Sequence, residues 1–264
     1  MEKIDQILDL IYQKLDDFVS VLKKITSLDL MVKLNELSAK IHSVFILAAA
    51  AVILITCFRL YFAFPGIPGY YLLYVIFSPV VILIPAYLSR DFHNACATLI
   101  SANKTTLSNN AILRFTAIIS LLIAPLVILA ALGLLFNGDV KSAITMLVYA
   151  LLLYMGAGTQ FNPSLLNIQI TNESTSGEDF VTIFSSYLKS FVYFEKILSS
   201  LLIFIGVISL IGFMIEPSSL IDLMWYVGYV VAGVTFPILV YLLFTVLWFF
   251  NSIILSILSL GKNR

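Results

Sequence analysis

Four side chains that can do chemistry stand close together near the middle of the sequence: Arg90, Asp91, His93 and Cys96. His93 and Cys96 are three residues apart, so on a helix they would share one face. Imidazole and thiolate can bind zinc, but a zinc site normally takes three or four ligands, and this group offers two. A structural role fits better, because Arg90 follows a long apolar run and Asp91 can neutralise it. We therefore predict no metal site here.

Signatures of catalysis or cofactor binding are missing elsewhere. The sequence contains no GxSxG, HExxH, Walker or GxGxxG motif. His42 stands alone before an apolar run, and Cys57 and Cys96 form no CxxC pair. No pair of acids lies inside an apolar run, where hydrolysis of a buried substrate would need one. We therefore predict that the protein is not an enzyme, and that it has no catalytic residue and no cofactor.

The composition of the chain indicates the environment in which these residues lie. The chain has 264 residues, 15 Lys and Arg against 15 Asp and Glu, and a net charge of zero. Charged residues make up 11% and hydrophobic residues 61%, with a mean hydropathy of +1.03. A soluble protein has roughly 25% charged residues, so this chain has too few polar groups to cover its outside. This excess of hydrophobic over charged residues, with a net charge of zero, excludes a soluble enzyme, a disordered chain and a nucleic-acid binder. It predicts an integral membrane protein.

Six apolar stretches have about the length of a membrane-spanning helix, which is roughly 20 residues. Runs such as Val80 to Ile84 are apolar on every face, which excludes the alternation of a transmembrane β-barrel. We predict an all-α helical bundle of three hairpins, residues 43–264, preceded by cytoplasmic helices over 1–42. The predicted spans are 43–62, 70–88, 115–136, 142–158, 197–215 and 224–247.

Charge near the span ends predicts the orientation. With a cytoplasmic N-terminus, only Arg59 and Lys141 of the 15 Lys and Arg lie outside. Both termini are therefore predicted to be cytoplasmic, in the inner membrane if the source is bacterial. Trp225 and Trp248 are 23 residues apart, about 34 Å in a helix. That distance suits the two interfacial belts, so we predict that they are interfacial anchors.

The N-terminal segment carries an apolar stripe with alternating steps of four and three residues, which is a heptad pattern. The stripe consists of Ile4, Leu8, Ile11, Leu15, Phe18, Leu22 and Ile25. It can pair with a helix of another protein chain, pack against the rest of this chain or lie on the membrane surface. Acids in its first half disfavour an anionic leaflet. We favour the first alternative and predict an assembly contact with a second copy or another membrane subunit.

A second stripe, rich in aromatic residues, occupies residues 178–196. Its few charges suit the headgroup boundary, and we predict a helix in the membrane plane that leads into the fifth span. Within the sixth span, Gly228, Ala232 and Gly233 could form a small-residue packing face.

The span interiors contain no ionisable residue, which disfavours a proton-coupled pump or a voltage sensor. We therefore expect a non-catalytic membrane protein that self-assembles or serves as a scaffold or accessory subunit, in contact with lipids and not with nucleic acid. The alternative is a passive channel or a carrier for small apolar or lipid-like solutes. Prolines in spans two, three and six could open a path for them.

Overall fold

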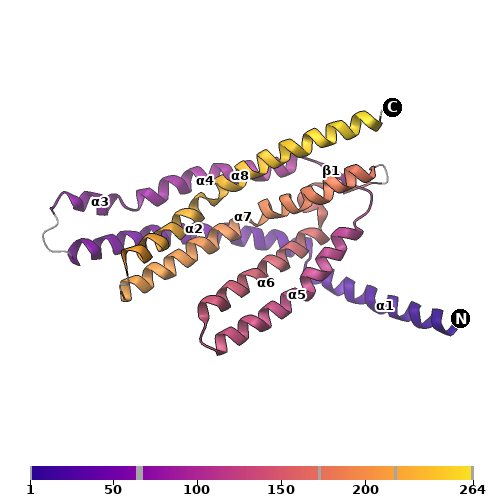
Figure 1. Ribbon diagram of the computed structural model, residues 1–264, viewed down its shortest axis with the longest axis horizontal. Coiled ribbons are helices and arrows are strands. Elements are labelled where there is room, and N and C mark those ends of the chain that lie inside the picture. Colours follow the sequence, from indigo (N-terminus) through magenta and orange to yellow (C-terminus); the bar gives the residue numbers. More distant parts are fainter. Residues whose placement is uncertain (1, 64–67, 172–173, 217–218, 263–264) are drawn as a thin grey trace. The chain divides into compact units, whose positions relative to one another are not determined.

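The computed structural model describes residues 2–63, 68–171, 174–216 and 219–262 (Figure 1). Nearly all of these residues are helical. The α-helices of the described part are α1 (Glu2–Ile25), α2 (Leu28–Ala63), α3 (Tyr71–Phe77), α4 (Val80–Ala102), α5 (Ala111–Phe136), α6 (Val140–Phe161), α7 (Ser176–Ile215) and α8 (Leu220–Lys262). A short 3₁₀ helix, η1 (Pro163–Leu166), and two strands, β1 (Thr105–Leu107) and β2 (Ile168–Ile170), complete them.

Six helical stretches among the described residues are long and apolar enough to cross a membrane. They contain the six predicted spans, except for Tyr70 at the start of the second, and they confirm the all-α class. The helices extend well beyond the spans: α7 has 40 residues and α8 has 43, whereas about 20 residues cross the hydrocarbon. Hydropathy located the apolar part of each helix but not its ends.

Two predicted elements differ from the structure. The second span is interrupted, because α3 ends at Phe77 and α4 begins at Val80. Pro79 lies in the gap, and its nitrogen cannot donate the hydrogen bond that would join the two helices. The predicted in-plane helix over 178–196 is not a separate element, since α7 continues without a break to Ile215. No proline or glycine stands between residues 178 and 205 to end it.

The chain forms two compact units, each built from separate parts of the sequence. The first unit comprises Met1–Leu34, Asn103–Ser190 and Ile253–Arg264, and the second comprises Asn35–Ala102 and Phe191–Ser252. Helices α2, α7 and α8 each contribute to both. Each unit is described separately below.

The first unit is centred on a hairpin of α5 and α6, which lie side by side (Figure 1). Gly138 forms the turn with a φ of +80°, a conformation that glycine adopts readily. Asp139 then caps α6 by accepting a hydrogen bond from the Ser142 backbone amide at 3.1 Å. Against this hairpin packs the last turn of α1, where Leu22 joins a core with Ala117, Leu121 and Ala157.

The same unit contains a small parallel sheet, which was not predicted from the sequence. Strand β1 pairs with β2 in the register Thr105 to Ile168. Beside it lies the fully buried Lys189 of α7, whose Nζ donates to the Asn103 carbonyl oxygen at 2.6 Å and to Thr105 Oγ1 at 3.2 Å. Lys189 precedes the predicted span at 197–215, and burial lowers its pKa to about 8. The amine is therefore still mostly protonated at pH 7 and can make both bonds.

The second unit contains the continuous apolar core that positions the candidate site. Its buried members come from α2, α4, α7 and α8: Ala49, Ile53, Ile82, Ile203, Val207, Leu210, Val230 and Val234. Helices α7 and α8 approach closely at two glycines. A Cβ added to Gly206 would lie 2.9 Å from the Tyr226 carbonyl oxygen, and one added to Gly233 would lie 2.8 Å from the Ile203 nitrogen. Such backbone proximity requires residues without side chains at both positions.

Candidate functional site

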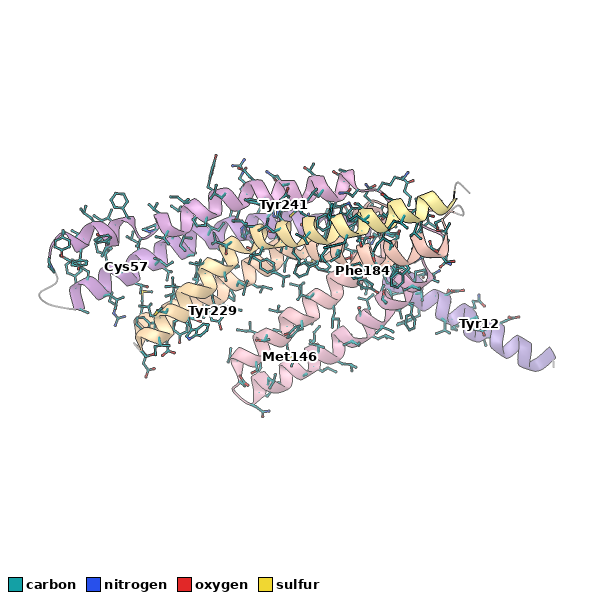
Figure 2. All side chains as sticks on the ribbon, turned by 45° about the horizontal axis from the view of Figure 1, so that its top comes forward. Tyr12, Cys57, Met146, Phe184, Tyr229 and Tyr241 are labelled. Atoms are coloured by element: carbon teal, nitrogen blue, oxygen red, sulfur yellow. The ribbon has the colours of Figure 1, made fainter. Side chains whose placement is uncertain are left out.

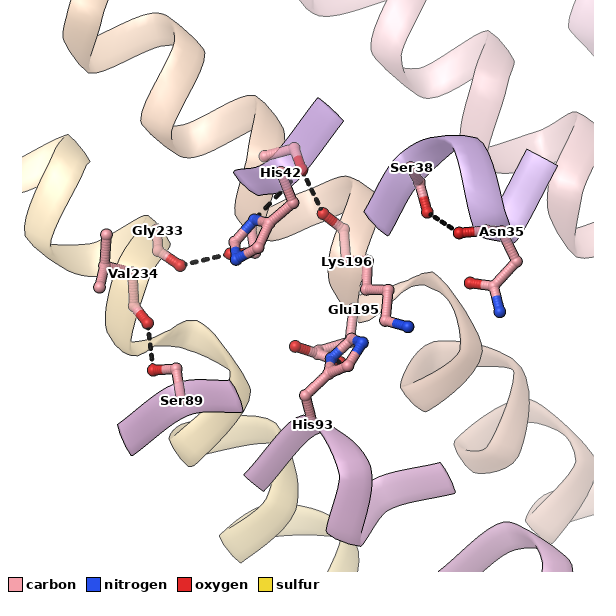
Figure 3. A network of polar contacts seen from close by, with 11 residues as sticks. Asn35, Ser38, His42, Ser89, His93, Glu195, Lys196, Gly233 and Val234 are labelled. Carbon is pink, nitrogen blue, oxygen red and sulfur yellow. Dashed lines mark hydrogen bonds and ion pairs between the residues drawn. The ribbon is translucent and has the colours of Figure 1, made fainter. Parts of the chain in front are cut away.

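Polar side chains from three helices of the second unit meet at one level of its bundle (Figure 3). The group contains His42 from α2, Ser89, Arg90, His93 and Asn94 from α4, and Glu195, Lys196, Ser199 and Ser200 from α7. In the sequence most of these residues flank the predicted spans 43–62, 70–88 and 197–215 on the side predicted to be cytoplasmic, and Ser199 and Ser200 lie in the first turn of the last of these spans. The fold therefore gathers the polar ends of three apolar helices.

These residues surround a cavity of about 330 Å³, near the lower end of the range for small-molecule pockets. Its lining is Ala39, His42, Ser43, Ile46, Ser89, Arg90, His93, Asn94, Lys196 and Pro237. Four of these side chains are basic and none is acidic. The cavity therefore presents positive charge from Arg90 and Lys196 and several hydrogen-bond donors, and its lining also includes the apolar Ala39, Ile46 and Pro237.

His93 faces a buried carboxylate behind the cavity wall. Its Nδ1 lies 2.5 Å from Glu195 Oε2, and the Glu195 side chain is only 1% exposed. The second oxygen, Oε1, has no hydrogen-bond partner among the described residues. A carboxylate removed from water needs a nearby proton donor, and His93 supplies it. The pair links α4 to α7 and gives one oxygen of the buried Glu195 carboxyl group a hydrogen-bond partner.

The orientation of His42 follows from the hydroxyl groups beside it. His42 Nδ1 lies 3.4 Å from Ser199 Oγ and 3.3 Å from Ser200 Oγ. Ser199 already donates its proton to the Gly233 carbonyl oxygen at 2.5 Å, and Ser200 donates to the Lys196 carbonyl oxygen at 2.7 Å. A hydroxyl has one proton to donate, so the imidazole Nδ1–H is the donor to the serines.

Two serines complete the backbone hydrogen bonding of α8 where Pro237 interrupts it. Proline has no N–H, so Pro237 leaves the carbonyl of Gly233, four residues earlier, without its helical partner. Ser199 Oγ donates to that carbonyl. Ser89 Oγ donates to the next carbonyl along, that of Val234. In an apolar surrounding such side-chain donors are what make a proline tolerable within a helix.

We expect Ser199→Ala to lower the free energy of unfolding by about 1–3 kcal/mol, because it leaves the Gly233 carbonyl buried without a donor. Adding Pro237→Ala to this variant restores a backbone N–H at position 237, so the double variant should lose less than Ser199→Ala does. Unfolding of the purified protein in mixed micelles with increasing SDS measures both. If Pro237→Ala gives no recovery, Ser199 does not replace the missing bond.

The residues predicted for assembly lie on α1, in the first unit. Leu22 is buried, whereas Leu15, Phe18 and Ile25 are 53%, 44% and 46% exposed. The side chains of Ile4, Leu8 and Ile11 lie outside the described part of the structure. The base of α1 is held in place, because Tyr154 Oη donates to the Ile25 carbonyl oxygen at 2.5 Å.

The predicted packing and anchoring residues of α8 lie in different surroundings. Gly233 is in close contact with α7, whereas a Cβ added to Gly228 would meet nothing within 4 Å, and Ala232 is exposed. Trp225 is 65% exposed. Trp248 stacks on Phe244 with ring centroids 5.6 Å apart.

Sequence reasoning grouped Arg90 with His93 but did not bring His42 or Lys196 to them. It missed Glu195 and the serine donors entirely. A signal for Glu195 does exist: it is an acid directly before a long apolar run, beside Lys196. Its partner is more than a hundred positions away, so only the packing of α4 on α7 identifies the pair.

Comparison with protein-family models, curated proteins and solved structures finds no match for this chain. Within the described ranges, no three His, Cys, Asp or Glu side chains are grouped so that they could hold one metal ion. The site is therefore interpreted from its own geometry: a basic cavity, a buried carboxyl group paired with a histidine, and a proline whose unpaired carbonyl partner accepts from a serine.

Proposed function

We propose that the chain is an integral membrane protein with six spans and both termini in the cytoplasm, and that it is a non-catalytic assembly or accessory subunit. The contact with another protein chain would be made by α1. The observation that carries this proposal is the exposed apolar stripe of that helix. Three of its four described side chains, Leu15, Phe18 and Ile25, remain exposed, and only Leu22 packs within the chain.

Membrane insertion is supported by the outer surfaces of the apolar helices. In the α5–α6 hairpin alone, Leu126, Leu129 and Phe136 are 64%, 63% and 89% exposed. Contiguous apolar surface of this kind is not stable in water, and lipid is the solvent that suits it. The strong bias of Lys and Arg toward one side of the spans supports the cytoplasmic placement of both termini.

The stripe on α1 suits a partner helix with an apolar stripe of its own, either from a second copy or from another membrane subunit. Tyr154 and Leu22 fix the base of α1, while its middle is open to contact; Tyr12, 60% exposed, lies in this open part (Figure 2). A helix anchored at one end loses less conformational entropy on pairing than a free one, which offsets the short length of the stripe.

The test changes the charge of the stripe without removing the helix. We expect the double variant Leu15→Glu and Phe18→Glu to lower the mass of the native assembly, extracted with its lipids and weighed by native mass spectrometry. Buried interhelical positions do not tolerate two unpaired carboxylates. The matched control is Gln13→Glu with Ser20→Glu, which adds the same charge to the opposite face and should leave the mass unchanged. A monomeric wild type, or a stripe variant of unchanged mass, would overturn the proposal.

The cavity of the second unit favours a second candidate, a carrier for lipid-like solutes. It combines basic side chains with an apolar wall formed by Ala39, Ile46 and Pro237, and an amphiphilic molecule needs both. Lipid scrambling by the protein in liposomes tests this role. Scrambling no faster than in protein-free liposomes would exclude it.

A further inference from the structure

We propose that the cavity of the second unit binds a phosphate group, carried either by a lipid headgroup or by a small soluble molecule. Arg90, Lys196 and Asn94 would be its principal ligands. This proposal does not depend on assembly through α1, and it adds a ligand class that the proposed function leaves open.

The charge of the cavity favours an anion. Arg90 and Lys196 both line it, and Glu195, the carboxylate next to Lys196 in the sequence, has one oxygen 2.5 Å from His93 Nδ1. Asp91 is the neighbour of Arg90 in the sequence but does not line the cavity. Within the described part of the chain, neither Arg90 nor Lys196 forms an ion pair with a carboxylate. Two cationic side chains therefore line the same cavity without a direct ion pair to a carboxylate among the described residues.

The hydrogen-bond donors of the cavity that have no partner among the described residues match the acceptor oxygens of a phosphate. The hydroxyls of Ser43 and Ser89 already donate to the backbone, to the carbonyls of Ala39 and Val234. No hydrogen bond within the described residues uses the side-chain donors of Arg90, Asn94 or Lys196. Arginine presents a planar pair of donors to phosphate, and lysine adds a mobile point charge. Phosphate has only acceptor oxygens at its charged face, so this set suits it better than it suits a cation or a neutral amide.

Size and position agree with a phosphate that carries a further group. The cavity has a volume of about 330 Å³, near the lower end of the range for small-molecule pockets, and this is more than a bare phosphate needs. The apolar wall of Ile46 and Pro237 can contact the remainder of the ligand. Arg90 and Lys196 flank the predicted spans 70–88 and 197–215, where the phosphates of lipid headgroups are found.

The experiment uses two probes on the full chain in nanodiscs of neutral phosphatidylcholine. Inorganic phosphate is titrated by calorimetry, and phosphatidic acid is added to the nanodiscs and its retention is measured by native mass spectrometry. We expect at least one probe to bind the wild type. Arg90→Gln and Lys196→Gln should each weaken that binding about tenfold or more, and Arg90→Lys should weaken it less because it retains the charge.

The matched control is Arg114→Gln, which removes an arginine from the same predicted membrane boundary but from the first unit. It should bind as the wild type does. Binding of phosphate alone would identify a soluble ligand, retention of phosphatidic acid alone would identify a lipid headgroup, and both outcomes support the site.

Failure of the wild type to bind either probe would overturn the proposal, as would equal weakening by Arg114→Gln. Arg90 is exposed, so Arg90→Gln leaves the core intact and keeps the test decisive if Lys196→Gln does not fold. The mass of the native assembly should stay unchanged in all these variants, which separates this site from the α1 contact.

Discussion

Replacing Gly233 by alanine is expected to destabilise the second unit by about 1–3 kcal/mol, because the new methyl group would overlap the backbone of α7. The added Cβ would lie 2.8 Å from the Ile203 nitrogen and 2.9 Å from the Ser199 carbonyl oxygen. Backbone atoms cannot rotate away as a side chain can, so α7 and α8 would have to separate. The free energy of unfolding in SDS-containing mixed micelles measures the loss.

The control is Gly228→Ala, five residues earlier on the same helix. An added Cβ there would meet nothing within 4 Å, and alanine favours a helix over glycine by about 1 kcal/mol. The control should therefore leave stability unchanged or raise it. Opposite signs for the two substitutions would establish the close approach of α7 and α8, and a loss at both positions would contradict it.

Removing the imidazole of His93 should have the other large effect. His93→Leu leaves the Glu195 carboxylate, 1% exposed, without its proton donor. Leaving a buried group without its hydrogen-bond partner typically costs about 1–3 kcal/mol, and more when that group is charged. We expect His93→Leu to lower the free energy of unfolding by about that amount in the same assay.

A second substitution separates this loss from a simple packing defect. Adding Glu195→Gln to His93→Leu removes the uncompensated charge, so the double variant should be more stable than His93→Leu alone. The difference is a coupling energy between the two residues. A double variant at least as unstable as the sum of the single ones would show that His93 does not stabilise Glu195.

The long helices could be predicted because their signal is local. Each span is a long, mainly apolar run without the alternation of a barrel strand, and such a run satisfies its backbone hydrogen bonds in lipid as a helix. The helix ends were harder to predict, because α4 and α7 extend into polar sequence where the hydropathy falls. Pro79 could be read as a possible interruption of the second span, yet proline alone does not decide between a kink and a break.

The strands and the polar site could not be predicted because they depend on contacts between distant residues. Strands β1 and β2 have three residues each and lie some sixty residues apart, so neither shows a usable alternation of side chains. His42 and Arg90 were recognisable as residues that flank apolar runs. Both residues line one cavity with Lys196 because of the way in which α2, α4 and α7 pack. The sequence pattern does not indicate this packing.

The serines that replace the missing bond at Pro237 also bear on the order in which the protein is made. Ser89 and Ser199 belong to α4 and α7, and both helices leave the ribosome before α8. When α8 emerges, the Gly233 carbonyl, which lacks its helical donor, can therefore meet the Ser199 hydroxyl that is already in place. Had the proline stood in an early helix, that carbonyl would have remained in the hydrocarbon without a donor until a later helix was synthesised. We expect α8 to be the last helix to pack against the others. We also expect α8 to insert slowly in any variant that delays the docking of α7.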